Sequence, residues 1–351
     1  MKSKYAGLAV LLAIILAGSG YYIWRTGTQV TVLNGYLGGE KIGLLEDEEI
    51  QGILKQKYHL QMDYSRAGSF DMITADSKDR DYLFPSSQTA LELYESTYGK
   101  PVADEIIFNT PLVLYSHRNV VAALEQQGVA YQTDGIWYVD MQKLAGLMLA
   151  ETSWSEIGLP ELYGSVLVDT TDPTKSNSGN MFAALLASAL NDGRTVDQNN
   201  IDTVLPQLQQ IFRRLGYMET SSSDLFNQFM RMGVGAKPII AGYESQIIEY
   251  AEEKPDDYAK VKDDIVILYP TPTVWSTHVY IALDDKGKLA TEALMDEEVQ
   301  RLAWEKHGFR TSTYETGQDG KNPGISGIAD RPKAVINMPD YTVMKRIIDG
   351  L

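Results

Sequence analysis

The sequence predicts an α/β fold with a mostly parallel sheet, and three observations support this prediction. Short apolar runs that are long enough for strands alternate along the chain with longer stretches of helical character, and this alternation is typical of parallel sheets. The chain has 351 residues, which is long enough for two lobes that each bury a core. Its composition, with 44% hydrophobic and 22% charged residues, is that of a globular protein.

The first part of the chain predicts three strands separated by helices. The strands are expected at residues 29–34, 59–64 and 82–87, and the helices at residues 42–57 and 89–98. In such an arrangement, ligands lie beyond the carboxyl ends of the strands. The turns that follow these strands are therefore the first places to look for binding residues.

Two pairs of residues in these turns are candidate ligand contacts. Gly38 and Gly39 lie in a glycine-rich turn after the first strand, where backbone N–H groups can approach a ligand closely. A tight turn without a ligand explains these glycines equally well. Ser86 and Ser87 end the third strand, although an ordinary helix cap would explain one of them.

A polar turn in the middle of the chain is the strongest candidate for a binding site. Residues 165–168 predict a buried strand, and residues 181–190 predict a helix rich in Ala and Leu. The candidate contacts between them are Ser176, Asn177, Ser178, Gly179 and Asn180. A helix N-terminus has unpaired N–H groups and a partial positive charge, so hydroxyls and amides there can receive an anion or a polar group. An ordinary well-capped helix is the alternative.

The other predicted elements continue the alternation. Residues 105–115 are apolar, but Pro111 lies among them and lacks the N–H that a central strand needs, so this segment is not expected to be a simple central strand. Helices are expected at residues 119–126, 141–150, 201–215, 221–232, 290–306 and 341–348, and strands at residues 239–241, 264–269 and 275–283. Tyr243 and Ser245 stand where the strand at 239–241 gives way to a further helix, and Glu244 between them is expected to favour that helix start.

Five segments of the chain resemble the bacterial extracellular solute-binding proteins, in particular the two-lobed class that includes sulfate, molybdate and iron binders. The order and spacing of these segments carry the resemblance, which extends over nearly the whole chain after the N-terminal segment. They are residues 108–115 (Phe-Asn-Thr-Pro-Leu-Val-Leu-Tyr), 154–164, 172–180 (Asp-Pro-Thr-Lys-Ser-Asn-Ser-Gly-Asn), 241–246 (Ala-Gly-Tyr-Glu-Ser-Gln) and 308–310 (Gly-Phe-Arg).

The resemblance implies a periplasmic-binding-protein type II fold, in which two mixed sheets flanked by helices are joined by a two-strand hinge. Residues 26–112 and 268–351 would form lobe 1, and residues 113–267 would form lobe 2. The chain would cross between the lobes near Pro111. The resemblance also implies that the turn with Gly38 and Gly39, and the helix start with Tyr243 and Ser245, face the cleft between the lobes.

The resemblance further implies that the lobes close over a small solute and deliver it to membrane permease and ATPase subunits of an ABC-type importer. The hydroxyls of Ser176 to Asn180 and of Ser86 and Ser87 suit a tetrahedral oxyanion such as sulfate, molybdate or phosphate. No cluster of His, Tyr and carboxylate residues indicates a metal cation. The alternative is a membrane-tethered sensor or interaction subunit that keeps this fold without transport.

The charge of the chain excludes two classes of partner. Its formal net charge is −16, whereas nucleic-acid binding and docking on an anionic membrane surface need basic patches. A small anion is not excluded, because local dipoles act at short range. There is no cysteine, so disulfides and thiolate sites are impossible. No motif predicts catalytic residues, a metal site or a cofactor, and the four histidines lack metal-ligand spacing.

Residues 1–25 predict a signal peptide or an N-terminal membrane anchor. Lys2 and Lys4 precede an apolar run that begins at Ala6, and Ala17-Gly18-Ser19 resembles a cleavage site. Ser19 stands where a lipoprotein would have its lipidated cysteine, which rules out the usual lipid anchor. The aromatic residues at 21, 22 and 24 favour an uncleaved anchor, because such residues gather at membrane interfaces. Either interpretation places the rest of the chain on the extracellular side of the cytoplasmic membrane.

Overall fold

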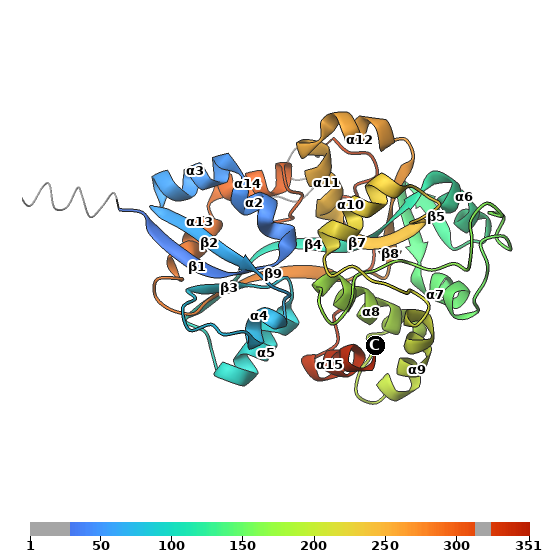
Figure 1. The fold of residues 1–351 in the computed structure, drawn as a ribbon, viewed down its shortest axis with the longest axis horizontal. Coiled ribbons are helices and arrows are strands. Elements are labelled where there is room, and N and C mark those ends of the chain that lie inside the picture. The colour runs from blue at the N-terminus through green and yellow to red at the C-terminus, as the bar shows by residue number, and fades with distance from the viewer. Residues whose placement is uncertain (1–28, 313–323) are drawn as a thin grey trace, which may run out of the picture.

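The computed structural model describes residues 29–312 and 324–351 and shows two α/β lobes side by side (Figure 1). Lobe 1 contains β1 (Thr31–Leu37), η1 (Gly39–Lys41), α2 (Ile42–Glu46), α3 (Glu48–Lys57), β2 (Leu60–Arg66), α4 (Asp71–Thr74), β3 (Tyr82–Phe84), α5 (Gln88–Tyr98), β9 (Trp275–Ala282), α13 (Leu289–Leu294) and α14 (Glu297–Glu305). Lobe 2 contains α6 (Arg118–Gln126), β5 (Ala130–Thr133), β6 (Ile136–Asp140), α7 (Met141–Leu149), α8 (Asn177–Leu190), α9 (Ile201–Phe212), α10 (Ser222–Met232), β7 (Ile239–Tyr243), α11 (Glu244–Glu253), α12 (Pro255–Val261) and β8 (Ile265–Thr271).

One long strand, β4 (Ala103–His117), belongs to both lobes. Its residues 103–111 pair with β9 in lobe 1, and its residues 112–117 pair with β7 and β8 in lobe 2. The strand order is therefore continuous, β2-β1-β3-β9-β4-β8-β6-β5, with β7 also on β4. Parallel pairs (β1 with β2 and β3, β6 with β8) occur beside antiparallel ones, so the predicted mixed α/β architecture is confirmed. The expectation of a mostly parallel sheet is wrong, because five of the eight strand pairs among the described residues are antiparallel, and four of these five involve the long strands β4 and β9.

Pro111 lies where β4 changes partners between the lobes. It is opposite Trp275 of β9, whereas the next residue, Leu112, is opposite Tyr243 of β7. A proline cannot donate to a sheet ladder, so it is tolerated best where the pairing is interrupted. The second connection between the lobes runs from β8 to β9 through residues 272–274. These two crossings form the predicted hinge, and both lie in the middle of the molecule in Figure 1.

Each lobe has its own apolar core. Helix α8 is central to lobe 2, since every residue from Asn177 to Ala189 is buried, which explains its Ala- and Leu-rich sequence. In lobe 1 the rings of Phe84, Phe108 and Phe309 pack in succession, with centroid separations of 6.1 and 5.3 Å. A further buried cluster crosses between the lobes, because Trp304 of α14 packs in it with Ile247 and Ile248 of α11.

Three predicted elements differ from the structure. Residues 165–168 form no strand, although the next residue, Asp169, makes an isolated bridge to Ile240. The helices expected at 42–57 and 290–306 are each broken by an aspartate. Asp47 and Asp296 cap α3 and α14, because each side chain accepts hydrogen bonds from two backbone N–H groups of the following turn.

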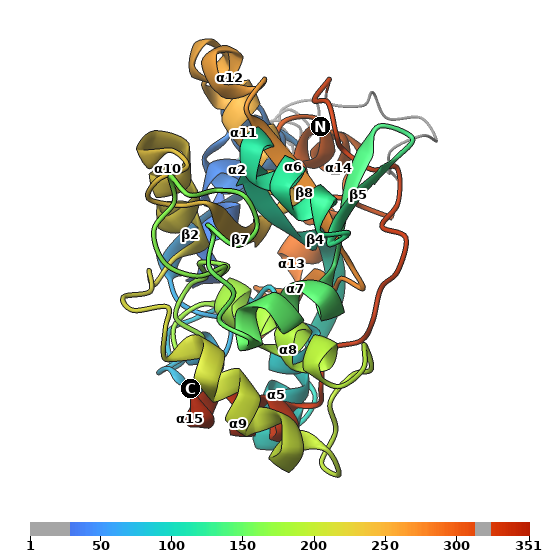
Figure 2. The same ribbon diagram turned by 90° about the vertical axis from the view of Figure 1, so that its right-hand side faces the viewer.

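The C-terminal helix α15 (Tyr341–Gly350) packs against α8 and α9 of lobe 2 and against α5 of lobe 1 (Figure 2). Its buried residues Val343, Met344 and Ile347 join the core of lobe 2, whereas the predicted boundaries counted this segment with lobe 1. No helix within residues 29–312 and 324–351 is long and apolar enough to span a membrane. The predicted signal peptide or anchor at residues 1–25 lies outside the described residues.

Candidate functional site

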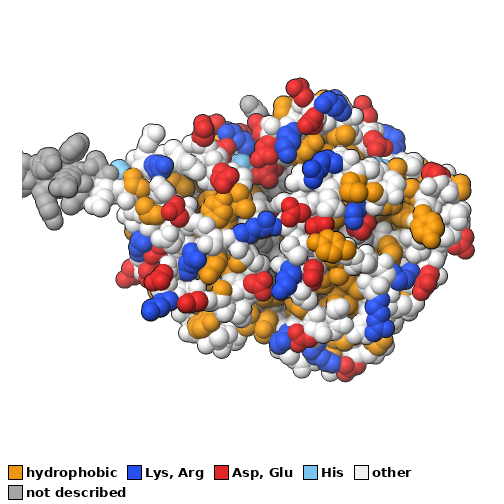
Figure 3. Space-filling view, in the orientation of Figure 1, with side chains coloured by type: hydrophobic (Ala, Val, Ile, Leu, Met, Phe, Trp, Pro, Cys, Tyr) orange, Lys and Arg blue, Asp and Glu red, His pale blue; other side chains and the backbone are white. Residues whose placement is uncertain are grey.

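A cleft of about 450 Å³ lies between the two lobes, and loops from both lobes line it. Lobe 1 contributes residues 38–40 after β1 and residues 66–71 after β2, and lobe 2 contributes residues 175–177 before α8 and residues 220–224 before α10. Figure 3 shows basic and acidic side chains facing each other across the middle of the molecule, where the lobes meet. The cleft therefore combines strand ends of one lobe with helix starts of the other.

The lobes touch beside this cleft. The Asn177 side chain of lobe 2 donates from Nδ2 to the Ser86 carbonyl of lobe 1 at 2.8 Å. At Gly68 the backbones approach so closely that an added Cβ would lie 2.7 Å from the Lys175 carbonyl oxygen. These contacts join lobe 1 to the turn before α8.

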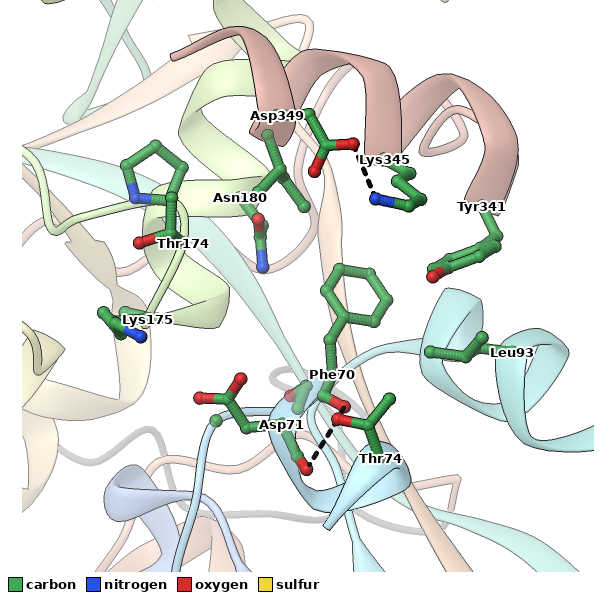
Figure 4. Close-up of a pocket in the computed structure, with 15 residues that line it drawn as sticks. Phe70, Asp71, Thr74, Leu93, Thr174, Lys175, Asn180, Tyr341, Lys345 and Asp349 are labelled. Carbon is green, nitrogen blue, oxygen red and sulfur yellow. Dashed lines mark hydrogen bonds and ion pairs between the residues drawn. The ribbon is translucent and has the colours of Figure 1, made fainter. Parts of the chain in front are cut away.

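A smaller pocket of about 170 Å³ lies beside the Gly68–Lys175 contact (Figure 4). Asn180 of α8 and the residues of α4 line it, and α15 closes one side with Tyr341 and Lys345. Asn180 is 4% exposed, and its Oδ1 has no hydrogen-bond partner among the described residues. The predicted site residue Asn180 thus lines this pocket and not the cleft, whereas Ser176 lines both and Asn177 lines the cleft.

A buried polar cluster forms the inner end of the cleft and centres on Lys41. Its side chain is 0% exposed, and Nζ lies 2.5 Å from Glu40 Oε1, 2.7 Å from Ser86 Oγ and 3.1 Å from His278 Nδ1. An ammonium can only donate, so His278 accepts on Nδ1. Ser86 Oγ donates in turn to Glu40 Oε1. Lys41 therefore uses all three donors within the protein, and its ion pair holds the Glu40 carboxylate in place.

The charges of this cluster follow from its burial. Burial alone would raise the pKa of Glu40, but Lys41, His278 and Ser86 outweigh that effect and lower the pKa to about 2. Burial lowers the pKa of His278 well below its ordinary value, and the charge of Lys41 acts in the same direction. Burial also lowers the pKa of Lys41, which Glu40 opposes. The cluster thus contains an ionised carboxylate and a neutral imidazole.

Tyr243 joins the cluster from lobe 2. Its hydroxyl accepts from Asn177 Nδ2 at 3.1 Å, and its side chain is 1% exposed. Burial raises the pKa of Tyr243, and the nearby Glu40 charge raises it further. Ser276 of β9 donates from Oγ to the Ser86 carbonyl at 3.0 Å. Side chains from both lobes and from the hinge strand therefore meet at one point.

The N-termini of α8 and α10 line the cleft from lobe 2. Their N-cap residues are Ser176 and Ser221, and neither serine makes a side-chain capping bond. Ser176 Oγ instead lies 3.0 Å from Ser178 Oγ, which in turn lies 2.7 Å from Thr171 Oγ1. Both helix starts therefore turn backbone N–H groups without side-chain caps toward the cleft.

The structure brings together some of the predicted site residues and separates others. Gly38, Gly39, Ser176 and Asn177 line the cleft, and Ser86 and Tyr243 join its buried cluster. Ser178 lies beside them, because its Oγ is 3.0 Å from that of Ser176. The remaining predicted residues, which contact other parts of the chain or other pockets, are Ser87, Gly179, Asn180 and Ser245.

Two of these separated residues have roles within the protein. A Cβ on Gly179 would lie 2.3 Å from the Thr171 carbonyl oxygen, so this glycine allows the turn before α8 to pack on its own helix. The Ser245 N–H donates to Thr110 Oγ1 of β4 at 3.2 Å, which ties α11 to the hinge strand.

Glu244 does more than favour a helix start. It is 0% exposed, and its two carboxylate oxygens accept from Arg310 Nε at 2.7 Å and from a second Arg310 nitrogen at 2.8 Å. This bidentate ion pair links α11 of lobe 2 to the segment after α14 of lobe 1, and Tyr269 also donates to Glu244. The Gly-Phe-Arg segment, residues 308–310, thus has a structural role.

Three residues of the charged cluster at the cleft were not predicted from the sequence. Glu40 and Lys41 follow directly after the predicted glycine turn, so their position at a strand end could have identified them. His278 could not have been found, because only the pairing of β9 beside β4 brings it near residue 41. Within the described residues, no group of three or more His, Asp or Glu side chains is placed to hold a metal ion.

Comparison with known proteins identifies the fold. No protein-family model matches the sequence, and no curated protein matches it. Among solved structures, a periplasmic thiamin-binding protein is similar with a TM-score of 0.63 at 9% identity, over 92% of this chain and 95% of that one. A sulfate-binding protein from Mycobacterium tuberculosis has a TM-score of 0.56 at 14% identity, over 88% and 94% of the two chains.

A third solved structure extends the range of ligands among these similar folds. It is a periplasmic binding protein from Actinobacillus pleuropneumoniae with fructose-6-phosphate bound, with a TM-score of 0.55 at 14% identity, over 90% of this chain and 96% of that one. All three are described as binding proteins and not as enzymes. The chain therefore has the two-lobed fold of the periplasmic solute-binding proteins, and the fold prediction is confirmed.

Proposed function

We propose that this protein is an extracellular solute-binding protein that closes its two lobes over a small polar solute. It would deliver the solute to the permease and ATPase subunits of an ABC-type importer. The fold supports this proposal, and so does a polar cleft at the hinge whose lining comes from both lobes. Clefts between lobes are common ligand sites, and closure by hinge bending excludes water from them.

We further propose that the solute carries an oxyanion group, which binds at the starts of α8 and α10. The single observation that carries this proposal is the convergence of these two helix N-termini, without side-chain caps, on one cleft. Such ends offer backbone N–H donors and a partial positive charge. The residues proposed to contact the solute are Gly38, Gly39, Ser86, Ser176, Asn177 and Tyr243, together with Glu40, Lys175, Ser221 and Ser222.

We also propose that residues 1–25 either anchor the protein in the cytoplasmic membrane or direct its export, so that the two lobes function outside that membrane. The sequence of this segment supports the proposal, because its basic start and apolar run are typical of a signal peptide or an anchor. Fractionation of cells that express the tagged chain, followed by N-terminal sequencing, tests whether the segment is retained. A full-length product in the cytoplasmic fraction would contradict this placement.

The test of solute binding is a thermal melt of the full-length protein against a panel of solutes. The panel contains inorganic oxyanions, organic phosphates and sulfonates, metal salts, sugars and amino acids. A solute at 100 times its Kd adds about 2.7 kcal/mol to the free energy of unfolding, which is a clear shift. We expect such a shift with an anionic member and with no metal salt. If no member shifts the melt, solute binding is wrong, and the tethered interaction subunit becomes the better interpretation.

A further inference from the structure

The inner end of the cleft presents hydrogen-bond acceptors to a ligand. Glu40 lines the cleft with a side chain that is 9% exposed. Its Oε1 is occupied by Lys41 and Ser86, whereas no described residue donates to its Oε2. A carboxylate has about four acceptor positions, so this one has capacity left for a donor.

A second acceptor lies at the same end of the cleft. Asn177 lines the cleft and is 7% exposed, and its Oδ1 is a buried atom with no hydrogen-bond partner among the described residues. The orientation of this amide is fixed, because Nδ2 must face the Ser86 carbonyl, which can only accept. A buried acceptor without a partner is unfavourable. A ligand that donates to Oδ1 would remove this cost.

The two acceptors belong to one cluster. The Tyr243 hydroxyl accepts from Asn177, and Glu40 is close enough to act on it electrostatically. The cationic donor of this cluster is already used, since Lys41 donates to Glu40, Ser86 and His278, and the Tyr243 hydroxyl is engaged with Asn177, Ser276 and Ser178. A bare oxyanion at this end would therefore meet a carboxylate and an amide oxygen with no free cation to bind it. The group that matches is one that only donates and carries positive charge.

We propose that the solute carries an ammonium or a similar N–H-rich cationic group, which binds Glu40 Oε2 and Asn177 Oδ1, in addition to an anionic group at the starts of α8 and α10. This inference rests on the proposed function and narrows it from oxyanions in general to small anions that bear an amine. Glu40 and Asn177 contact the solute. Lys41 and His278 are positioning residues, because they hold Glu40 without reaching the solute themselves.

The test uses pairs of probes that differ only in the amine. The first pair is 2-aminoethanesulfonate and 2-hydroxyethanesulfonate, and the second is 2-aminoethylphosphonate and ethylphosphonate. Inorganic sulfate and phosphate complete the set. Calorimetry with the full-length protein is expected to show the amine-bearing member of at least one pair binding at least tenfold more tightly than its partner.

Substitutions of the two acceptor residues test whether these residues cause the preference for the amine. Glu40→Gln keeps the shape of the side chain and is expected to reduce the amine preference to less than threefold. The matched control is Glu46→Gln on α2, which removes an exposed carboxylate outside the cleft and should leave the preference unchanged. Asn177→Ser is the second variant, in case Glu40→Gln lowers folding yield, and it should also reduce the ratio between the paired probes.

Each outcome decides between the two proposals. If sulfate, phosphate or an amine-free probe binds as tightly as the amine-bearing ones, this inference is overturned and the proposed function stands. If an amine preference survives in Glu40→Gln and in Asn177→Ser, the amine binds elsewhere and the inference is again overturned. If no probe and no member of the wider panel shifts the melt, both proposals fail together.

Discussion

The two sides of the cleft are built on different chemistry. Lobe 1 presents charged side chains at strand ends, and its Glu40 depends on the buried Lys41 to stay ionised and in place. Lobe 2 presents helix starts, where serine hydroxyls and backbone N–H groups stand beside the charged side chains of Lys175 and Asp224. Backbone donors are fixed by the helix itself, whereas the carboxylate needs buried partners to hold it. The side from lobe 1 should therefore be more sensitive to substitution than the side from lobe 2.

The largest expected effect is that of Lys41→Met, which removes the partner of Glu40. A buried charge left without its partner destabilises a protein by about 3–5 kcal/mol, and here the Glu40 carboxylate would keep only Ser86 as a donor. Chemical denaturation measures this loss as a lower free energy of unfolding. Lys55→Met on the exposed surface of α3 is the control and should change it by less than about 0.5 kcal/mol.

The double variant Glu40→Gln with Lys41→Met separates the ion pair from the packing of the lysine. Removing both charges should recover a large part of the stability, because no buried charge is then left unpaired. If the double variant is as unstable as Lys41→Met, then the packing of Lys41 against the Phe84 ring, 5.0 Å from its Nζ, matters more than the charge. The greater sensitivity of the lobe 1 side to substitution would then come from side-chain packing and not from charge.

The next largest effect is expected at the contact between the lobes. Gly68→Val places side-chain atoms where the Lys175 carbonyl already approaches, so the lobes should be held apart. We expect solute affinity to fall more than tenfold, because residues of both lobes must contact the solute together. Small-angle scattering should show a larger radius of gyration in the presence of the solute than for the parent protein.

Gly146→Val is the matched control for this substitution. Gly146 lies on α7, and nothing surrounds the position of its Cβ within 4 Å. The variant should bind the solute normally, and its helix should be no less stable, because Val has a higher helix propensity than Gly. Normal binding by Gly68→Val as well would mean that the lobes need not approach as closely as this structure shows.

The sequence predicted the lobe 2 side of the cleft better than the lobe 1 side, for a physical reason. A helix start depends on local residues, so Ser176 and Asn177 could be assigned from their neighbours alone. The lobe 1 cluster depends on contacts between residues far apart in the chain, as Lys41 and His278 show. At Gly179 the local pattern allows a second interpretation, because its small size also accommodates its own turn.

The same distinction explains the fold prediction. Alternating strands and helices predicted the α/β class, because hydrophobic periodicity is a local property. The break between α2 and α3 was missed, because the apolar pattern continues across Asp47 while its carboxylate caps the second helix. The apolar residues at 165–168 are buried by packing on lobe 2 without joining a sheet, as Val166 and Val168 show. A buried apolar run is expected both for a strand in a sheet and for a segment that packs on the lobe without pairing, so the sequence could not distinguish them.

A smaller effect is expected from the exposed ion pair between Arg66 of lobe 1 and Asp224 of lobe 2. Their charged atoms are 3.8 Å apart, and the side chains are 47% and 57% exposed. Such pairs contribute about 0–1 kcal/mol, so Arg66→Gln should weaken solute binding by less than about fivefold, and less at high salt. Arg194→Gln, which removes a similar exposed pair far from the cleft, is the control. A tenfold loss that persists at high salt would instead identify Arg66 as a direct ligand contact.

The smallest expected effect is the response of amine binding to acid, which tests whether Lys41 controls Glu40. Because folding lowers the pKa of Glu40 to about 2, its contribution to stability is present above its ordinary pKa and is lost as the pH falls through about 2. The affinity for 2-aminoethanesulfonate, if it binds, should therefore change little between pH 7 and pH 4. An ordinary glutamate with a pKa of 4.5 would weaken binding about fourfold over this range, because most of it would be protonated at pH 4. Calorimetry at pH 7, 5 and 4, with melts to confirm folding, measures the difference. A fourfold loss would show that the lobe 1 carboxylate is not held ionised by its buried partner, and the contrast between the two sides of the cleft would disappear.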